Sequence, residues 1–512
     1  MPEFIALDAL VRRHAIDAPA RVAVIDGDRQ LSYAGLDRLV DAVAAALQAD
    51  GLVPGDAISI CAYSSLEYVA AFLGALRAGV AVAPLAPSST PADFAAMLKD
   101  SGAKVLFTDA GSAAVMGGAA NAAGVRRVAL DDGPSGLPFS GWAAAGRKPA
   151  PIEIDPESVF NIIYSSGTTG TPKGIVHSHA MRWRQYSQWE ALTHRADGVT
   201  VLSTPLYSNT TLVCFNPTLA AGGTVVLMKK FDARGFLELS QKHKATHAML
   251  VPVQYRRIMA LPDFDSFDLS SFVMKFSTSA PFAAALKADV LKRWPGGLTE
   301  YYGMTEGGGT CMLLAHEFPD KLHTVGRPMT DHDIRLIGED GNEVAPGEVG
   351  EIFGHSANIM LGYLNQPAKT AETFWHDASG KCFVRTGDVG RFDSDGFLVL
   401  MDRKKDMIIS GGFNIYPSDL EAVLAGHPDV LEAAVVAMPS EDWGETPVAF
   451  VVLRPGATTQ AAILKAWTNE RVGKFQRLAD VHFAASLPRS AIGKVLKREL
   501  RDRQLAAEGV DI

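Results

Sequence analysis

Cysteine is scarce in this chain, with only four among 512 residues. Cys61, Cys214, Cys311 and Cys382 are far apart, and none belongs to a CxxC pair or to another metal-ligand spacing. This scarcity excludes a disulfide framework and a cysteine-bound metal. It predicts reduced thiols in a cytoplasmic protein.

Histidine does not suggest a metal site either. His243 and His247 have the i,i+4 spacing of a helix, but no carboxylate lies between them, unlike the His-Glu-x-x-His motif of zinc metalloproteases. His177 and His179 are likewise interpreted as structural side chains.

Excess positive charge and long apolar runs are also absent. Lys and Arg number 48 against 57 Asp and Glu, a net charge of −9, which argues against nucleic-acid and anionic-membrane partners. The N-terminus lacks the basic and apolar regions of a secretory signal. The longest apolar stretch, residues 68–87, contains Arg77, glycines and prolines, and it predicts a buried helix and strand rather than a membrane span.

The composition is that of a globular enzyme. Hydrophobic residues make up 47% and charged residues 21% of the chain. A chain of 512 residues is long enough for two to four packed units.

The pattern along the first two thirds of the chain predicts an α/β architecture. Up to residue 142, helical patterns alternate with short apolar runs, and after a proline-rich connector at 148–156 the alternation resumes. The apolar runs are at residues 22–25, 57–60, 80–82, 159–164, 224–227 and 273–276, and the first helical patterns are at 32–49 and after Ser65. We expect two layered α/β subdomains.

The remaining third has a different hydrophobic pattern. Short alternating runs separated by turn residues predict a small β-barrel from about Asp331, in runs at 333–336, 350–353 and 396–400. Beyond residues 403–405 the pattern predicts a small α+β domain, with helices at 418–425 and about 459–470 and strands at 432–436 and 449–453. We therefore expect a domain at 1–402, a hinge at 403–405 and a domain at 406–512.

Residues 164–174, Tyr-Ser-Ser-Gly-Thr-Thr-Gly-Thr-Pro-Lys-Gly, are the most informative segment. Glycines allow the backbone to point several N–H groups inward, the hydroxyls add donors, and Lys173 adds a positive charge, so the segment predicts a phosphate-binding loop. It is not the loop of P-loop NTPases, because Pro172 precedes the lysine and Gly174 follows it.

Further motifs follow this loop in a fixed order. They are Ser279-Ala280-Pro281, Tyr301-Tyr302-Gly303-Met304-Thr305-Glu306, Gly362-Tyr363, Arg385-Thr386-Gly387-Asp388, residues 402–406, Gly411-Gly412-Phe413-Asn414 and Pro488-Arg489-Ser490-Ala491-Ile492-Gly493-Lys494. The series resembles the signature of the adenylate-forming superfamily, in its acyl-CoA synthetase branch, over nearly the whole chain. The resemblance implies a large N-terminal domain, a small mobile C-terminal domain, and ATP, Mg²⁺ and coenzyme A as cofactors.

By this resemblance, one group of residues binds ATP and AMP. The loop would hold the β- and γ-phosphates, Thr305 the α-phosphate, Glu306 the Mg²⁺ ion and Asp388 the ribose hydroxyls. The nucleotide set is Ser165, Ser166, Gly167, Thr168, Thr169, Gly170, Lys173, Ser279, Ala280, Pro281, Tyr301, Tyr302, Gly303, Asp388 and Arg403.

The resemblance also assigns roles near the chain's end. Lys494 would contact the reacting carboxylate and phosphate oxygens, and, with Thr305 and Glu306, completes the catalytic set. Lys405 would be the hinge about which the C-terminal domain turns for thioester formation. Candidate CoA-binding residues are Gly411, Gly412, Trp443, Lys474, Phe475 and Arg477.

The acyl pocket departs from the family pattern. Many relatives have an aromatic residue followed by histidine where this chain has Tyr207 and Ser208. The candidate lining residues are Tyr207, Ser208, Asn209, Val251, Pro252, Gln254, Thr278, Gly303 and Met304. None is an unpaired cation, so we expect a monocarboxylic acid that is small, branched, alicyclic or aromatic, rather than a dicarboxylate.

Three functions remain open from the sequence. The leading one is an AMP-forming acid:CoA ligase, the second an adenylation protein that loads a carrier-protein thiol, and the third a non-catalytic adenylate-binding sensor or scaffold. The exposed loop expected around Lys494 also suggests a lysine acyltransferase as a partner, and a homodimer is possible.

Overall fold

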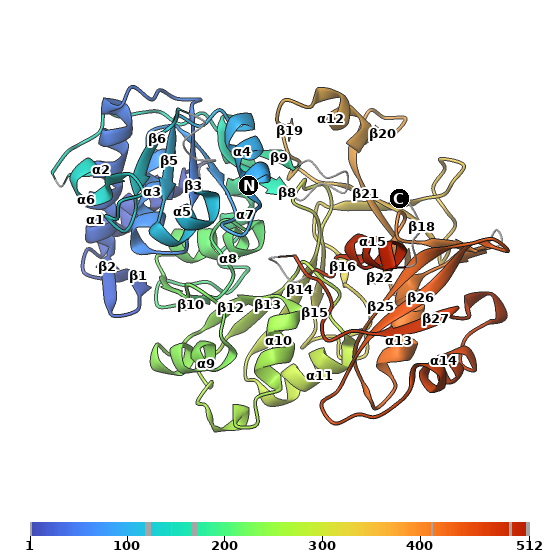
Figure 1. Ribbon diagram of the computed structural model, residues 1–512. Helices are drawn as coiled ribbons and strands as arrows, with labels where there is room; N and C mark the ends of the chain where they lie inside the picture. The colour runs from blue at the N-terminus through green and yellow to red at the C-terminus, as the bar shows by residue number, and fades with distance from the viewer. Residues whose placement is uncertain are drawn as a thin grey trace. The chain divides into compact units, whose positions relative to one another are not determined.

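The computed structural model describes residues 3–117, 124–144, 146–165, 172–410, 413–490 and 494–507, apart from the Phe475 side chain. The chain divides into two compact units (Figure 1). The first comprises Met1–Asp333 and Gly354–Val384, and the second comprises Ile334–Phe353 and Arg385–Ile512. The chain passes between the units at three points, near residues 333, 353 and 384.

The first unit contains an eight-stranded sheet in the order β19-β9-β8-β4-β3-β5-β6-β7. Its central strands are parallel, while β8 pairs antiparallel with β9, and β9 with β19. The strands are β3 (Ala57–Cys61), β4 (Ala81–Pro84), β5 (Val105–Thr108), β6 (Arg126–Ala129), β7 (Leu137–Pro138), β8 (Val159–Ser165), β9 (Lys173–Ser178) and β19 (Gly362–Tyr363).

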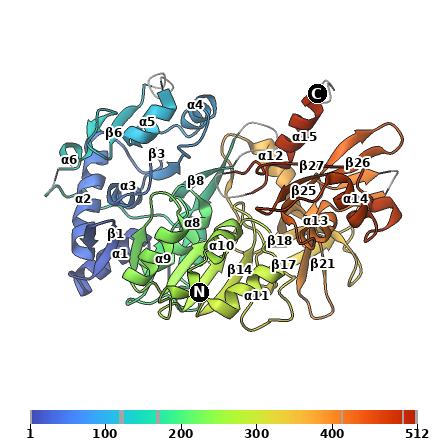
Figure 2. The same ribbon diagram turned by 60° about the horizontal axis from the view of Figure 1, so that its bottom comes forward.

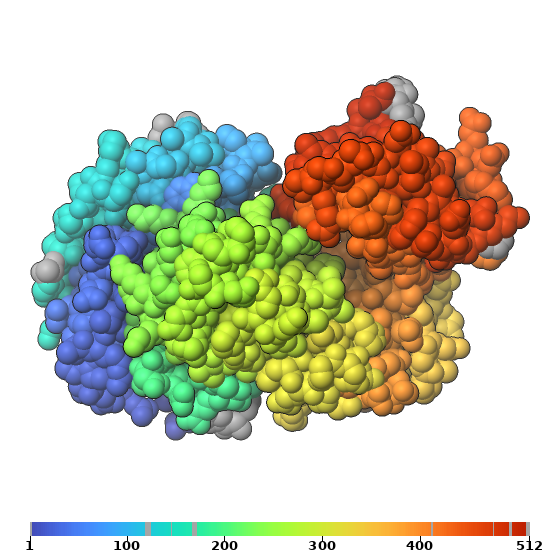
Figure 3. Space-filling view, turned by 90° about the horizontal axis from the view of Figure 1, so that it is seen from below, coloured from blue at the N-terminus to red at the C-terminus, as the bar shows by residue number. Residues whose placement is uncertain are grey.

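The same unit contains a nine-stranded sheet in the order β16-β15-β14-β13-β12-β10-β11-β1-β2. The strands are β1 (Val22–Asp26), β2 (Arg29–Ser32), β10 (Val199–Leu202), β11 (Thr224–Leu227), β12 (His247–Leu250), β13 (Met274–Ser277), β14 (Gly297–Tyr302), β15 (Cys311–Leu314) and β16 (Arg327–Pro328). The run at 22–25, grouped with the first layer by sequence, belongs instead to this sheet, because Val24 pairs with Val225. Figure 3 shows the N-terminal segment in dark blue beside green residues of this sheet region.

Helices of the first unit share one core with both sheets. Phe72 of α3 makes edge-on contacts with Phe160 of β8 and Phe215 of α8. The helices are α1 (Leu7–Asp17), α2 (Tyr33–Ala49), α3 (Leu66–Arg77), α4 (Pro91–Asp100), α5 (Ala110–Met116), α6 (Phe139–Trp142), α7 (His179–Tyr186), α8 (Asn209–Ala220), α9 (Ala233–Lys242), α10 (Pro252–Met259), α11 (Ala284–Arg293) and α12 (Pro367–Thr373), with a short 3₁₀ turn at Phe264–Ser266.

Every residue of helix α3 except Glu67 is buried, as the apolar stretch predicts, and the buried residues include Arg77. The Arg77 guanidinium pairs with Asp8 at 3.3 Å, Asp37 at 2.7 Å and Asp41 at 2.9 Å. Burying a cation without charged or hydrogen-bonding partners is costly, and these carboxylates offset that cost for Arg77. None of the described helices is long and apolar enough to cross a membrane.

Short strands follow residue 332, as the sequence predicts. They form a five-stranded sheet of β17 (Asp333–Ile337), β18 (Gly350–His355), β20 (Phe374–His376), β21 (Cys382–Phe392) and β22 (Leu398–Arg403). The antiparallel pairing of β21 with β22 places Asp388 opposite Arg403.

The C-terminal part of the second unit is an α+β sandwich (Figure 2). Leu420 and Leu464 pack with Val435 and Val451 on one face of its sheet, while Leu500 packs with strand residues of the other face. Its elements are β23 (Ile408–Ser410), β24 (Phe413–Ile415), α13 (Pro417–Ala425), β25 (Val430–Ser440), β26 (Gly444–Leu453), α14 (Ala461–Asn469), a 3₁₀ turn (Lys474–Gln476), β27 (Asp480–Phe483) and α15 (Lys497–Ala507).

A buried ion pair supports the strand that leads into the Tyr-Tyr-Gly motif. Lys287 of α11 pairs with Glu300 of β14, and their side chains are 2% and 4% exposed. The Lys287 ammonium also donates to the Leu322 and Thr324 carbonyls at 2.8 and 3.0 Å. The pair therefore ties α11 and the loop after β15 to β14.

Lys287→Met leaves the Glu300 carboxylate buried without its cation. We expect it to lower the free energy of unfolding by about 3–5 kcal/mol, measured by urea unfolding with tryptophan fluorescence. Arg234→Met, which removes an exposed pair with Asp263, is the matched control and should leave the curve nearly unchanged. Equal effects of the two substitutions would contradict this account.

Candidate active site

Four predicted site segments lie at one edge of the nine-stranded sheet. Strands β10, β12, β13 and β14 are parallel neighbours, so their carboxyl ends meet at the same edge. The segments that follow these strands are 203–209, 251–254, 278–281 and 303–306. This edge is where open α/β sheets bind ligands.

The predicted phosphate loop joins two antiparallel strands. Ser165 ends β8, Lys173 begins β9, and the two residues are paired across the ladder. Ser166, Gly167, Thr168, Thr169 and Gly170 lie outside the described residues, so their predicted roles stay predictions.

Lys173 occupies a partly buried, charged environment. Its ammonium lies 5.2 Å from the centre of the Tyr363 ring. Burial and the neighbouring Lys369 ammonium lower the pKa of Lys173, while Glu306 and Glu372 raise it. Two cations with a carboxylate close by suit the binding of a polyanion that carries a divalent cation.

The Thr305–Glu306 turn is fastened by hydrogen bonds. The Tyr363 hydroxyl donates to Glu306 Oε1 at 2.9 Å, and the Met360 N–H donates to the Glu306 carbonyl at 2.9 Å. Gly307 follows with φ +79°, and a Cβ there would lie 1.8 Å from the Asn358 carbonyl oxygen. The turn therefore requires glycine and holds the Glu306 carboxylate in place.

A polar cluster lies behind this turn. Asn161 and His177 face each other across β8 and β9, and Arg182 of α7 is buried with them. Arg182 donates to Asn161 Oδ1 at 3.0 Å and to His177 Nδ1 at 2.8 Å, and His177 Nε2 bonds the Thr305 carbonyl at 2.7 Å. Sequence reasoning missed these contacts, and the only local signal was the polarity of Asn161 in an apolar strand.

Two further segments of the predicted nucleotide set, 279–281 and 301–303, lie at the same sheet edge. Ser279 has φ +81°, an unusual conformation for a side-chain-bearing residue, and its hydroxyl lies 2.7 Å from Thr210 Oγ1. Tyr301 stacks on Phe276, with ring centres 6.0 Å apart, and Tyr302 is buried. Ala280 is half-buried, and Pro281 and Gly303 are exposed.

The segments proposed to line the acyl pocket combine polar and apolar residues, which are buried or half-buried apart from Gly303. Ser208 precedes α8, and Asn209 Oδ1 is buried with no hydrogen-bond partner among the described residues. Gln254 Oε1 accepts from the Val251 N–H at 3.1 Å and so caps α10. Burial raises the pKa of the Tyr207 phenol. Thr278 and Met304 are half-buried.

The predicted ribose site lies in the second unit. Arg403 Nε pairs with Asp388 Oδ1 at 3.0 Å, and the Asp388 N–H donates to Thr386 Oγ1 at 3.0 Å. The guanidinium therefore orients the carboxylate. Burial lowers the pKa of Lys405, two residues further on.

Lys494 is exposed, and its backbone is held by two hydrogen bonds to Ser490. The Ser490 N–H donates to the Lys494 carbonyl at 2.8 Å, and the Lys494 N–H donates to Ser490 Oγ at 3.2 Å. Lys497 anchors the start of α15 through Glu421 at 2.9 Å.

The candidate CoA-binding residues are divided between described and undescribed parts of the chain. Trp443, Lys474 and Arg477 are exposed in the second unit. Gly411, Gly412 and the Phe475 side chain lie outside the described residues, so the predictions for them stand as predictions.

Residues of the site fit a magnesium ion delivered with a nucleotide. Within the described ranges, no three His, Cys, Asp or Glu side chains form a group that could hold a metal. Mg²⁺ at nucleotide sites usually takes one or two carboxylates together with phosphate oxygens and water. The fastened Glu306 carboxylate fits this requirement.

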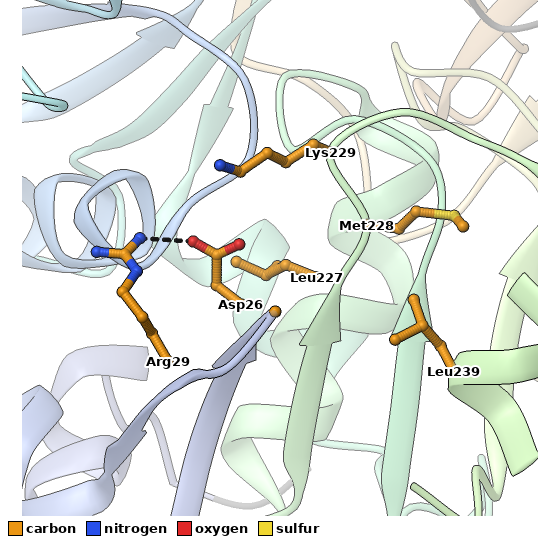
Figure 4. Close-up of a pocket in the computed structure, with 7 residues that line it drawn as sticks. Asp26, Arg29, Leu227, Met228, Lys229 and Leu239 are labelled. Carbon is orange, nitrogen blue, oxygen red and sulfur yellow. Dashed lines mark hydrogen bonds and ion pairs between the residues drawn. The ribbon is translucent and has the colours of Figure 1, made fainter. Parts of the chain in front are cut away.

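An open groove elsewhere in the first unit shares no residue with the site. It lies where β1 and β11 end and is lined by Asp26, Lys229 and Leu239, among others (Figure 4). Arg29 and Asp26 pair there at 2.6 Å, as the dashed line in Figure 4 shows. Lys229 is exposed and offers a control position.

Lys369→Met removes the second cation beside Lys173. We expect the pKa of Lys173 to rise, because a neighbouring positive charge is lost. The proton of Lys173 should therefore be released at higher pH. Competitive acetylation of Lys173, measured across pH by mass spectrometry, reports this shift. Lys229→Met should leave the profile unchanged, and an unchanged profile for Lys369→Met would contradict the described proximity.

Comparisons with known proteins identify the family of this chain. The pattern of the family described as "AMP-binding enzyme" matches residues 11–364, and that of the "AMP-binding enzyme C-terminal domain" matches residues 419–494. Of the similar solved structures, the amide bond synthetase McbA from Marinactinospora thermotolerans has a TM-score of 0.86 and 28% identity, covering 97% of this chain and 99% of its own. ATP-bound MatB from Rhodopseudomonas palustris has a TM-score of 0.87 and 29% identity, covering 98% and 99%.

Three relatives match almost from end to end. 4-Coumarate–CoA ligase 2 of Nicotiana tabacum is 33% identical over 99% of this chain and 96% of its own. Indoleacetate–CoA ligase of Aromatoleum aromaticum is 34% identical over 97% of each chain. The fatty acid–[acyl-carrier-protein] ligase ScoC of Streptomyces coeruleorubidus is 32% identical over 96% and 95%. The chain therefore belongs to the AMP-binding enzyme family, in the acyl-CoA synthetase branch of adenylate-forming enzymes.

Proposed function

We propose that this chain is an ATP-dependent acid:CoA ligase. A carboxylate attacks the α-phosphate of ATP to form an acyl-AMP and pyrophosphate, and the CoA thiol then displaces AMP to form the thioester. The observation that carries the proposal is the Thr305–Glu306 turn, fastened beside a hairpin that ends in the phosphate loop and Lys173. CoA-ligase relatives of full length support it.

The residues of the first unit serve adenylation. Lys173 binds the triphosphate, Thr305 bonds the α-phosphate and Glu306 holds Mg²⁺, which supplies charge neutralisation when bound. The carboxylate of the acid enters at the sheet edge, beside segments 203–209 and 278–281. Holding both anions in line supplies much of the rate.

The residues of the second unit complete the reaction. Asp388, oriented by Arg403, receives the ribose hydroxyls, and Lys494 stabilises charge on the carboxylate and phosphate oxygens. Rotation about Lys405 exchanges the adenylation and thioester arrangements, in which Gly411 and Gly412 admit the CoA thiol.

The acid is a monocarboxylate, and aromatic acids are the class to test first. Two of the relatives are named for the aromatic acids coumarate and indoleacetate. Ser208 and Asn209 give the pocket polar groups, and Asn209 Oδ1 can accept a hydrogen bond from a ring substituent. No candidate lining residue is a cation that would bind a second carboxylate.

A carrier-protein thiol is the second candidate acceptor. ScoC is named as an acyl-carrier-protein ligase, and its identity to this chain is close to that of the CoA ligases. A non-catalytic sensor is disfavoured because Lys173, Glu306, Asp388 and Lys494 are all present. Acyltransferase modification of Lys494, a homodimer and a cytoplasmic location remain predictions.

An acid panel with ATP, Mg²⁺ and either CoA or a carrier protein tests the function. We expect an aromatic monocarboxylate to cause pyrophosphate release, with multiple turnovers when CoA is present. Lys494→Ala should slow adenylation about 100-fold or more, because charge stabilisation is lost. The control is Lys497→Arg, which changes a lysine three residues after Lys494 but keeps its positive charge. Multiple turnovers with a carrier protein as the acceptor, but not with CoA, would contradict the CoA assignment.

Lys405→Pro tests the hinge. Proline fixes φ and so restricts rotation of the backbone at this position. We expect adenylation, followed as pyrophosphate release in a single turnover, to change less than about threefold, while thioester formation falls about tenfold or more. The flanking Lys404→Ala serves as the control. Equal losses in both steps would contradict a hinge at Lys405.

A further inference from the structure

The Asn161–His177–Arg182 cluster has no part in the function proposed so far. Asn161, His177 and Arg182 are all fully buried. No carboxylate among the described residues pairs with the Arg182 guanidinium, whose pKa burial lowers to about 9. A buried cation that is costly to keep suggests a role beyond filling space.

The hydrogen bonds fix the position of the His177 proton. Arg182 Nη2 can only donate, so His177 Nδ1, 2.8 Å away, must accept. The proton is then on Nε2, which donates to the Thr305 carbonyl at 2.7 Å. Burial, with the adjacent guanidinium, keeps the pKa of His177 well below its ordinary value, so the ring stays neutral.

The bond to Thr305 joins two parts of the site that are far apart in sequence. Asn161 and His177 belong to the hairpin that carries the phosphate loop. Thr305 begins the turn. The next residue, Glu306, accepts hydrogen bonds from the Tyr363 hydroxyl and the Met360 N–H. His177 therefore fixes the turn relative to the hairpin.

We propose that His177, with its tautomer set by Arg182, is a positioning residue that aligns the Thr305–Glu306 turn with the β8–β9 hairpin and its Lys173 for binding of the magnesium–nucleotide complex. The inference rests on the proposed function, because it concerns the same adenylation site. It predicts that the site requires a hydrogen-bond donor at the position of His177 Nε2, facing the Thr305 carbonyl.

Two substitutions at this position separate alignment from packing. His177→Phe keeps a ring of similar shape but removes the donor, whereas His177→Gln keeps an N–H near the position of Nε2. We expect His177→Phe to lower kcat for adenylation about tenfold with little change in KM for the acid, and His177→Gln to restore it to within about threefold.

His179→Phe is the matched control. His179 is buried two residues away, and neither of its ring nitrogens has a hydrogen-bond partner among the described residues. The substitution therefore changes a buried histidine without removing a bond. We expect kcat to remain near the wild-type value, whereas a purely structural role of His177 would make the two Phe variants alike.

Nucleotide binding provides a readout that does not depend on finding the acid. Calorimetry with ATP should show His177→Phe binding about tenfold more weakly than wild type in Mg²⁺, with little difference in EDTA. Equal affinity in Mg²⁺, or a loss that His177→Gln does not restore, would overturn the inference. Absence of pyrophosphate release from wild type would instead overturn the proposed function.

Discussion

The antiparallel pairing of β8 with β9 is the constraint on which the site depends. It pairs Ser165 with Lys173, on either side of the segment proposed to bind phosphate, and it faces Asn161 toward His177. The hairpin then contacts the rest of the site through side chains, Lys173 against Tyr363 and His177 against the Thr305 carbonyl. Because Tyr363 also bonds Glu306, one hairpin organises both the cationic and the carboxylate groups of the site.

The charges at this site are balanced for an anion that arrives with its own cation. Burial and repulsion by the Lys369 ammonium lower the pKa of Lys173, and the Glu306 carboxylate acts in the opposite direction. A triphosphate with Mg²⁺ would satisfy both the lysines and the carboxylate. The buried Arg182 differs, because its charge is used within the protein to orient a neutral histidine.

Local sequence predicted the parts of the site but not how they meet. The α/β layers were predictable because the alternation of strand and helix patterns along the chain encodes them, whereas the phosphate-binding role of residues 164–174 and the roles of Thr305 and Glu306 stay predictions. The contact of His177 with Thr305 was not, because 128 residues separate them. The pairing of β1 with β11 was missed for the same reason, and the capping role of the Gln254 amide depends on a backbone turn that periodicity does not reveal.

Formation of an acyl-AMP is the central claim, and trapping it in a single turnover tests that claim most directly. Enzyme in excess over α-labelled ATP would be mixed with Mg²⁺ and an accepted acid, without CoA, and quenched in acid. The account predicts labelled acyl-AMP that forms together with pyrophosphate and is converted to AMP and thioester when CoA is added. Release of ADP and phosphate, with no labelled acyl-AMP, would contradict it.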